Sequence, residues 1–121
     1  MNAVNIKEKF SLFSENWTPK IVGELNQQQV KLAKLKGEFV WHSHEDEDEL
    51  FMIFKGTLIM EFRDRTETLK EGDMLIVPRG VEHFPRTEAG EEVWVLLFEP
   101  AATKHTGVVE HEKTVHDQEW I

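Results

Sequence analysis

The sequence contains no cysteine and no tyrosine among its 121 residues. Without cysteine the chain can form neither disulfide bonds nor a thiolate metal site, so any metal must be held by nitrogen and oxygen atoms. Basic residues are also few, because 14 lysines and arginines stand against 23 acids and leave a formal net charge of -9. Such a charge repels nucleic acid and anionic membranes at long range, and we expect neither as a partner.

Long apolar runs are missing as well. The two longest, LFMIF from residue 50 and VWVLLF from residue 93, fall far short of the ~20 residues that span a bilayer. The first residues, MNAVNIKEKF, lack the basic start and the apolar stretch of a signal peptide. We therefore expect a cytoplasmic protein that spans no membrane.

The first 19 residues have a helical pattern. Apolar side chains recur at spacings of four, three and four, from Ile6 to Trp17, and Asn5 with Glu8 resembles a capping box. This predicts a short amphipathic helix that ends before Pro19 and covers one opening of a barrel.

Residues 20–100 contain short apolar segments separated by turns with glycine, and no helical period persists there. This pattern predicts an all-β barrel or sandwich. The remaining residues, 101–121, are polar and are predicted to form a C-terminal tail. The chain is thus interpreted as a helical segment, a single β-barrel domain and a tail.

The LFMIF and VWVLLF segments do not alternate between apolar and polar residues, so both faces of their strands are expected to be buried. The inner faces would fill the barrel, with Phe51, Ile53, Met74 and Ile76 among the lining residues. The outer faces need another covering, and a homodimer partner is the simplest one.

Two histidines, His42 and His44, stand two residues apart on a predicted strand over residues 38–44. Both imidazoles therefore point to one face, and burying them is costly unless they have partners. A metal ion supplies such a partner to both. The turn EDED would return Glu49 beside them, and His83 follows a Pro-Arg-Gly turn further along. The pattern predicts a cluster of three imidazoles and one carboxylate, with Glu45, Glu47 and Asp48 as competing carboxylates.

At these residues the sequence resembles the cupin superfamily. Its first motif is matched by Gly37, four residues, His42-Ser43-His44, four residues, Glu49, six residues and Gly56. Its second motif is matched by Gly72, five residues, Pro78-Arg79-Gly80, two residues, His83, three residues and Thr87. The first motif is one residue short, and Thr87 stands where the family often has asparagine. The resemblance implies a jelly-roll barrel and selects Glu49, so that His42, His44, Glu49 and His83 are the expected metal ligands.

Three nitrogen ligands and one carboxylate leave two positions open on an octahedral ion. This suits one divalent transition metal, either iron, manganese, nickel or a catalytic zinc. The family includes metal-dependent dioxygenases and sugar or sugar-phosphate isomerases, so an enzyme acting on a small oxygenated metabolite is expected. A small-ligand or metal-binding module without turnover is the alternative. Metal-free cupin epimerases use a tyrosine acid, which this chain lacks.

Other polar residues are given simpler interpretations. His105, His111 and His116 lie in the polar tail at spacings that match no single face, and are expected to be exposed. Arg86 is expected to be exposed too, with binding of an anionic substrate at the barrel mouth as the alternative. No catalytic residue beyond the metal ligands can be assigned from the sequence.

Overall fold

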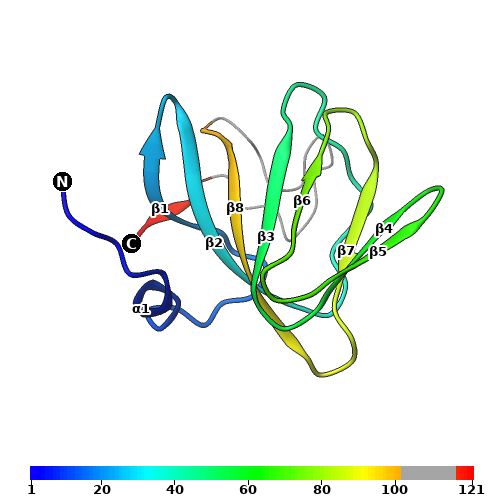
Figure 1. The fold of residues 1–121 in the computed structure, drawn as a ribbon, viewed down its shortest axis with the longest axis horizontal. Coiled ribbons are helices and arrows are strands. Elements are labelled where there is room, and N and C mark those ends of the chain that lie inside the picture. Colours follow the sequence, from blue (N-terminus) through cyan, green and yellow to red (C-terminus); the bar gives the residue numbers. More distant parts are fainter. Residues whose placement is uncertain (102–116) are drawn as a thin grey trace.

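The computed structural model describes residues 1–101 and 117–121. In these residues the chain forms two β-sheets and one short helix, which confirms the predicted all-β jelly-roll (Figure 1). The elements, in chain order, are α1 (Ile6–Phe10), β1 (Lys20–Leu25), β2 (Gln28–Lys36), β3 (Glu49–Lys55), β4 (Leu58–Phe62), β5 (Thr66–Leu69), β6 (Met74–Val77), β7 (His83–Arg86), β8 (Glu92–Pro100) and β9 (Glu119–Trp120).

The larger sheet has the strand order β6-β3-β8-β2-β1-β9 within the described residues. Its strands pair antiparallel, except that β9, at the end of the chain, pairs parallel with β1. Along β8 the burial alternates strictly, because one face of a strand points into the barrel and the other points out. The inward side chains of β2, β3 and β8 form much of the main core.

The smaller sheet, with the order β5-β4-β7, closes the barrel from the other side. Leu58, Met60 and Phe62 of β4 are buried in the main core. Residues 38–44, which were predicted to form a strand, lie beside β7 instead as an irregular segment with isolated bridges. This segment carries two of the expected metal ligands.

The N-terminal helix is shorter than predicted and lies elsewhere. It contains only Ile6–Phe10, with the side chain of Asn5 accepting a hydrogen bond from the Glu8 N–H at 2.9 Å. Phe10 stacks on Trp94 with ring centroids 4.9 Å apart, on the outer face of the larger sheet. The helix therefore covers part of that outer face rather than an opening of the barrel.

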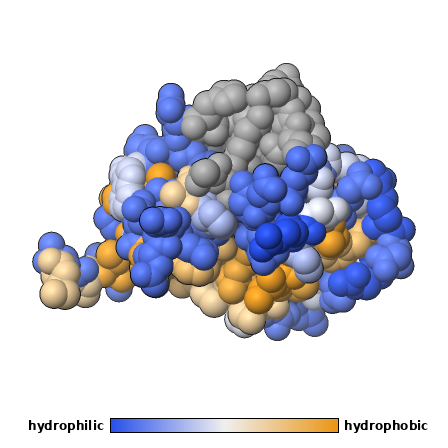
Figure 2. Space-filling model, turned by 90° about the horizontal axis from the view of Figure 1, so that it is seen from above, coloured by the Kyte–Doolittle hydropathy of each residue, from blue (hydrophilic) through white to orange (hydrophobic). Residues whose placement is uncertain are grey.

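The rest of the outer face carries an apolar patch over β6 and its neighbours. Met74 and Ile76 are 60% and 52% exposed, so the prediction that they line the barrel is wrong. They pair with Met52 and Leu50, which are half-buried, and Phe98 lies next to Leu50 on the other side. These five residues are called the β6–β3 patch, and Figure 2 shows apolar residues gathered on one face of the molecule.

In the described parts of the chain, no helix has the length and apolar character needed to cross a membrane.

Candidate metal centre

The first two histidines are positioned by main-chain contacts with β7. The N–H of His42 donates to the carbonyl of His83 at 3.0 Å, and the N–H of His83 donates back at 2.9 Å. A third bond, from Phe39 N–H to the Pro85 carbonyl at 3.0 Å, holds the segment further along. The predicted alternation survives in this irregular backbone, because His42 and His44 are buried while the residues between and before them are half-buried.

The turn that follows His44 selects one carboxylate among several. Asp48 accepts hydrogen bonds from the backbone N–H of Arg79 at 2.9 Å and from its side chain at 3.4 Å, which ties this turn to the Pro-Arg-Gly turn. The N–H of Gly80 also donates to the carbonyl of His44, at 2.7 Å. Glu49 then begins β3 with its side chain buried, whereas Glu45 and Asp48 are exposed.

The structure brings the four expected ligands together. One ligand atom from each of His42, His44, Glu49 and His83 lies within 4.8 Å of the others, and all four residues are buried. Oε1 of Glu49 lies 3.3 Å from Nε2 of His44 and 3.6 Å from Nε2 of His83.

Backbone contacts orient two of the imidazoles. Nδ1 of His42 lies 2.8 Å from the Val40 carbonyl, and Nδ1 of His83 lies 2.9 Å from the Val81 carbonyl. Because a carbonyl can only accept, each Nδ1 donates its N–H to it, which leaves Nε2 as the ring atom that can bind a metal. Burial, followed by the nearby charge of His83, lowers the pKa of His42 to about 3. His42 is therefore neutral at pH 7, as a metal ligand must be.

Three buried atoms of the cluster have no hydrogen-bond partner among the described residues, namely Nε2 of His44, Oε1 of Glu49 and Nε2 of His83. Buried polar atoms without partners are rare and costly in folded proteins. A divalent cation among them would satisfy all three at once, and nitrogen with carboxylate oxygen suits a transition metal. The residues present therefore fit a metal ion.

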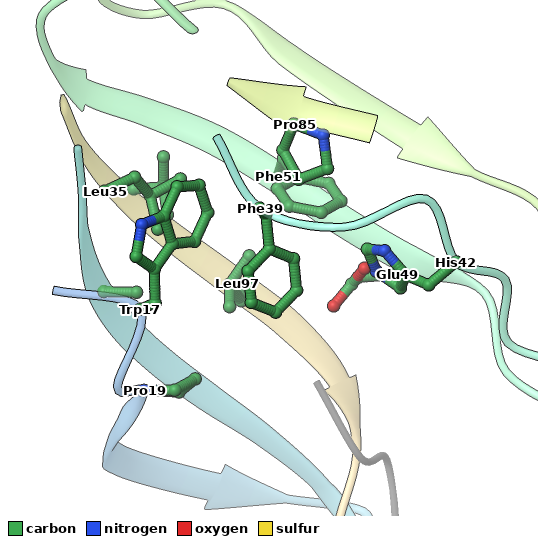
Figure 3. A pocket seen from close by; sticks show the side chains of 11 residues that line it. Trp17, Pro19, Leu35, Phe39, His42, Glu49, Phe51, Pro85 and Leu97 are labelled. Carbon is green, nitrogen blue, oxygen red and sulfur yellow. The ribbon is translucent and has the colours of Figure 1, made fainter. Parts of the chain in front are cut away.

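A pocket adjoins this cluster and encloses about 380 Å³ of space, part of it open to solvent. His42 and Glu49 lie at one end and Trp17 lies at the other, with Phe39 and Phe51 between them (Figure 3). The rings of Trp17 and Phe39 stack with centroids 4.7 Å apart. The indole N–H of Trp17 donates to the Lys36 carbonyl at 2.9 Å, so that this ring presents only apolar surface to the pocket.

Comparison with known proteins agrees with this arrangement. Residues 29–99 match the cupin domain family, which is more than half of the chain. The chain belongs to the cupins. This cupin is 40% identical over 86 residues to the uncharacterized protein YdbB of Bacillus subtilis, with 70% of each chain covered.

Solved structures show the same fold. A cupin-2 domain containing protein from Shewanella frigidimarina matches this cupin with a TM-score of 0.77 and 47% identity, over 80% of this chain and 93% of the other. Protein NMB1881 from Neisseria meningitidis matches with a TM-score of 0.74 and 31% identity, over 82% and 99% of the two chains. The resemblance seen in the two motifs is thereby confirmed.

The remaining expectations from the sequence concern Arg86, the three histidines of the C-terminal segment, and Thr87. Arg86 is half-buried rather than exposed, and its Nε donates to the Glu61 carboxylate of β4 at 2.7 Å. His105, His111 and His116 lie outside the described residues. Thr87, which replaces the common asparagine, has a structural role, since its hydroxyl accepts from the Gly37 N–H at 2.8 Å.

Sequence reasoning missed a buried acid beside the cluster. Glu99 of β8 has no exposed surface, and the pairing of β3 with β8 places it beside Glu49. Burial, and then the negative charge of Glu49, raises the pKa of Glu99 well above its usual range. Burial opposes ionisation of Glu49 too, but Glu99, His44 and His83 together hold its pKa well below the usual range. The sequence signal that could have revealed Glu99 is an acidic residue at a position of β8 whose alternation predicts an inward side chain.

Proposed function

We propose that this cupin binds one divalent transition metal through His42, His44, Glu49 and His83, and that it is an enzyme acting on a small oxygenated metabolite. The observation that carries the proposal is the convergence of four buried ligand atoms within 4.8 Å of one another. Three imidazoles and one carboxylate, without sulfur, suit iron, manganese, nickel or a catalytic zinc.

A metal held here would supply Lewis acidity or, for a redox-active ion, electron transfer to dioxygen. The protein itself contributes four ligands and therefore leaves room for a substrate that presents two oxygen atoms. The reaction would be of the dioxygenase or isomerase type.

The pocket lining supports a substrate with an apolar body. Among the described residues that line the pocket, all except His42 and Glu49 are apolar, and none is lysine or arginine. A phosphate group would lose its hydration there without gaining a cationic partner, which is costly. A short carbon body would instead gain from contact with Phe39, Phe51 and Leu97. This favours an apolar oxygenated acid or ketone over a sugar phosphate.

A binding module without turnover is the second candidate. His42 and Glu49 are the titratable residues among those that line the pocket, and both are assigned to the metal. Among the residues that the structure describes, the lining therefore leaves no further side chain to act as a general acid or base. This observation favours ligand capture, and a measurement of turnover separates the two candidates.

Elemental analysis of tag-free protein, beside a His42→Ala variant, tests the metal. We expect about one equivalent of a transition metal in the wild type and its loss in the variant. Failure of both proteins to bind metal, even after reconstitution with iron, manganese, nickel and zinc, would contradict the proposal. The loaded protein is then assayed for oxygen uptake with small keto and hydroxy acids. Tight binding without uptake or product would support the binding module.

The assembly and the location are proposed on other grounds. A homodimer would cover the exposed β6–β3 patch, since apolar patches of this kind commonly mark interfaces. The net charge of -9 supports a protein that binds neither nucleic acid nor anionic membranes. A cytoplasmic location is tested by cell fractionation, and recovery in the membrane or extracellular fraction would contradict it.

A further inference from the structure

Two buried charged side chains lie inside the barrel, where their strands are otherwise mainly apolar. The inward side chains of β8 are apolar from residue 93 until Glu99. In β2 the inward side chains are apolar from residue 35 back to residue 33, and the next inward side chain toward the start of the strand is Lys31. In both strands the apolar pattern stops toward the end of the sheet where β3 begins with Glu49.

The register of the sheet brings these side chains together. Leu50 of β3 pairs with Phe98 of β8. The residues one step further, Glu49 and Glu99, therefore stand side by side. Nζ of Lys31 lies 2.9 Å from Oε1 of Glu99, and the Glu99 and Glu49 side chains are both buried at these adjacent positions. The ion pair and the register thus place the three side chains in a row that ends at the metal cluster.

Stability alone does not account for this pair. Lys31 and Glu99 are both 0% exposed. Removing two charges from water costs free energy that their attraction often fails to recover, and apolar residues of similar volume usually serve a core as well. A neighbouring metal ligand gives the pair a role, because ligating carboxylates are themselves held by hydrogen bonds that fix their orientation.

We propose that Glu99, held by Lys31, is a positioning residue that orients the Glu49 carboxylate toward the metal. This inference rests on the proposed metal site. The required property of residue 99 is its shape, together with one group that accepts from the Lys31 ammonium and one that bonds the Glu49 carboxylate. Glutamine has both groups on a side chain of the same length, since its carbonyl accepts and its amide donates. An apolar side chain has neither.

The experiment titrates Co²⁺ into metal-free wild type and three variants. One variant is Glu99→Gln. The other two carry Lys31→Met together with either Glu99→Gln or Glu99→Met. In the last of these both charges are removed together, so no unpaired charge stays buried. Affinity is measured by calorimetry, and the coordination geometry is followed by the visible absorption of bound Co²⁺. Folding is checked by circular dichroism.

Glu99→Gln should bind Co²⁺ as the wild type does, with the same absorption spectrum. Lys31→Met, Glu99→Gln should have an affinity between those of the wild type and of the Lys31→Met, Glu99→Met protein, because it keeps the group that reaches Glu49 but loses the ammonium that holds residue 99. The Lys31→Met, Glu99→Met protein should fold but bind Co²⁺ about 10- to 100-fold more weakly, with a changed spectrum. If it does not fold, Glu99→Leu in the same background replaces it. Lys34→Met and Glu92→Met are matched controls on the same two strands. Lys34 Nζ donates to the Phe13 carbonyl and Glu92 accepts from the Trp94 indole, both away from the cluster, so neither control should change binding.

Several outcomes would overturn the inference alone. One is equal affinity and equal spectra for the methionine and glutamine variants. Another is an equal loss of Co²⁺ affinity in the Lys31→Met, Glu99→Gln and the Lys31→Met, Glu99→Met proteins, because glutamine would then fail to restore the position of Glu49. A wild type that binds neither Co²⁺ nor any other transition metal would instead overturn the proposed metal site, and this inference with it.

Discussion

The backbones of His42 and His83 exchange two hydrogen bonds, at 3.0 and 2.9 Å, and their imidazole centroids lie 4.1 Å apart. The two residues belong to the two separate motifs of the sequence, and their bridge stands outside the named strand pairs. The halves of the proposed metal site are thus joined by main-chain atoms. A change of either side chain leaves this link in place, which makes the ligands suitable targets for substitution.

Replacing His83 with alanine should remove most of the metal affinity while the fold is kept. Loss of a residue that merely supports a ligand typically costs 10–100-fold in affinity, so loss of a ligand should cost more than about 100-fold. Calorimetric titration with Ni²⁺ or Zn²⁺ measures the effect, and thermal melting checks the fold. His111→Ala, in the polar C-terminal segment, is the control and should bind as the wild type does. Equal binding by both variants would show that the assignment of the four ligands is wrong.

The Thr87 hydroxyl should contribute measurably to stability. It accepts a hydrogen bond from the Gly37 N–H, and Thr87 N–H donates to the Gly37 carbonyl. Thr87→Val keeps the shape but leaves the Gly37 N–H without this partner, which should lower the free energy of unfolding by about 1–3 kcal/mol. Thr87→Ser should lose less, because it keeps the hydroxyl.

Urea denaturation measures these changes. Thr68→Val is the matched control, since Thr68 is exposed on β5, and it should shift the free energy of unfolding by less than about 0.5 kcal/mol. A Thr87→Val protein as stable as the wild type would show that the hydrogen bond to Gly37 contributes nothing.

The fold class could be predicted because its signals are local and repeated. Short apolar segments and glycine turns indicate strands, and the two histidine motifs select one arrangement of them. The family resemblance selected Glu49 among the neighbouring acids, and the clustering of the three histidines was predictable for the same reason as the fold. It depends on a two-residue alternation that persists even though residues 38–44 form no regular strand.

Other features depend on contacts that one sequence does not display. Phe13 and Trp17 continue the helical spacing of α1, yet the chain leaves the helix at Ser11 and both side chains pack from an irregular segment. β6 consists only of apolar residues, so its pattern does not tell which face is inward. Pairing with β3 decides this and turns Met74 and Ile76 outward. The role of Glu99 depends on the register between β3 and β8.

At Trp17 a glycine variant should be more stable than an alanine variant, which reverses the usual order, because of the backbone conformation of this residue. Its φ of 56° lies in the left-handed region, where a Cβ atom costs about 1–2 kcal/mol. Trp17→Ala removes a buried aromatic ring and should lower the free energy of unfolding by about 3–5 kcal/mol. Trp17→Gly should be about 1 kcal/mol more stable than Trp17→Ala, because glycine relieves the strain.

The control for this comparison is Phe13, a buried aromatic residue without a positive φ. There the order should be the ordinary one, with Phe13→Ala more stable than Phe13→Gly. Urea denaturation of the four variants gives both differences. The same order at the two positions would contradict the effect of the Trp17 backbone.

The β6–β3 patch should be the interface of a homodimer. β6 is an edge strand of the larger sheet in the described residues, and its exposed Met74 and Ile76 adjoin the half-buried apolar side chains of β3 and β8. Sedimentation velocity at micromolar concentration should show a dimer for the wild type and a monomer for Ile76→Lys, because a buried lysine charge opposes association. Leu25→Lys, at an exposed apolar residue of β1 outside the patch, is the control and should remain dimeric. A monomeric wild type would contradict the proposed dimer, and an Ile76→Lys protein that still dimerises would move the interface to another surface.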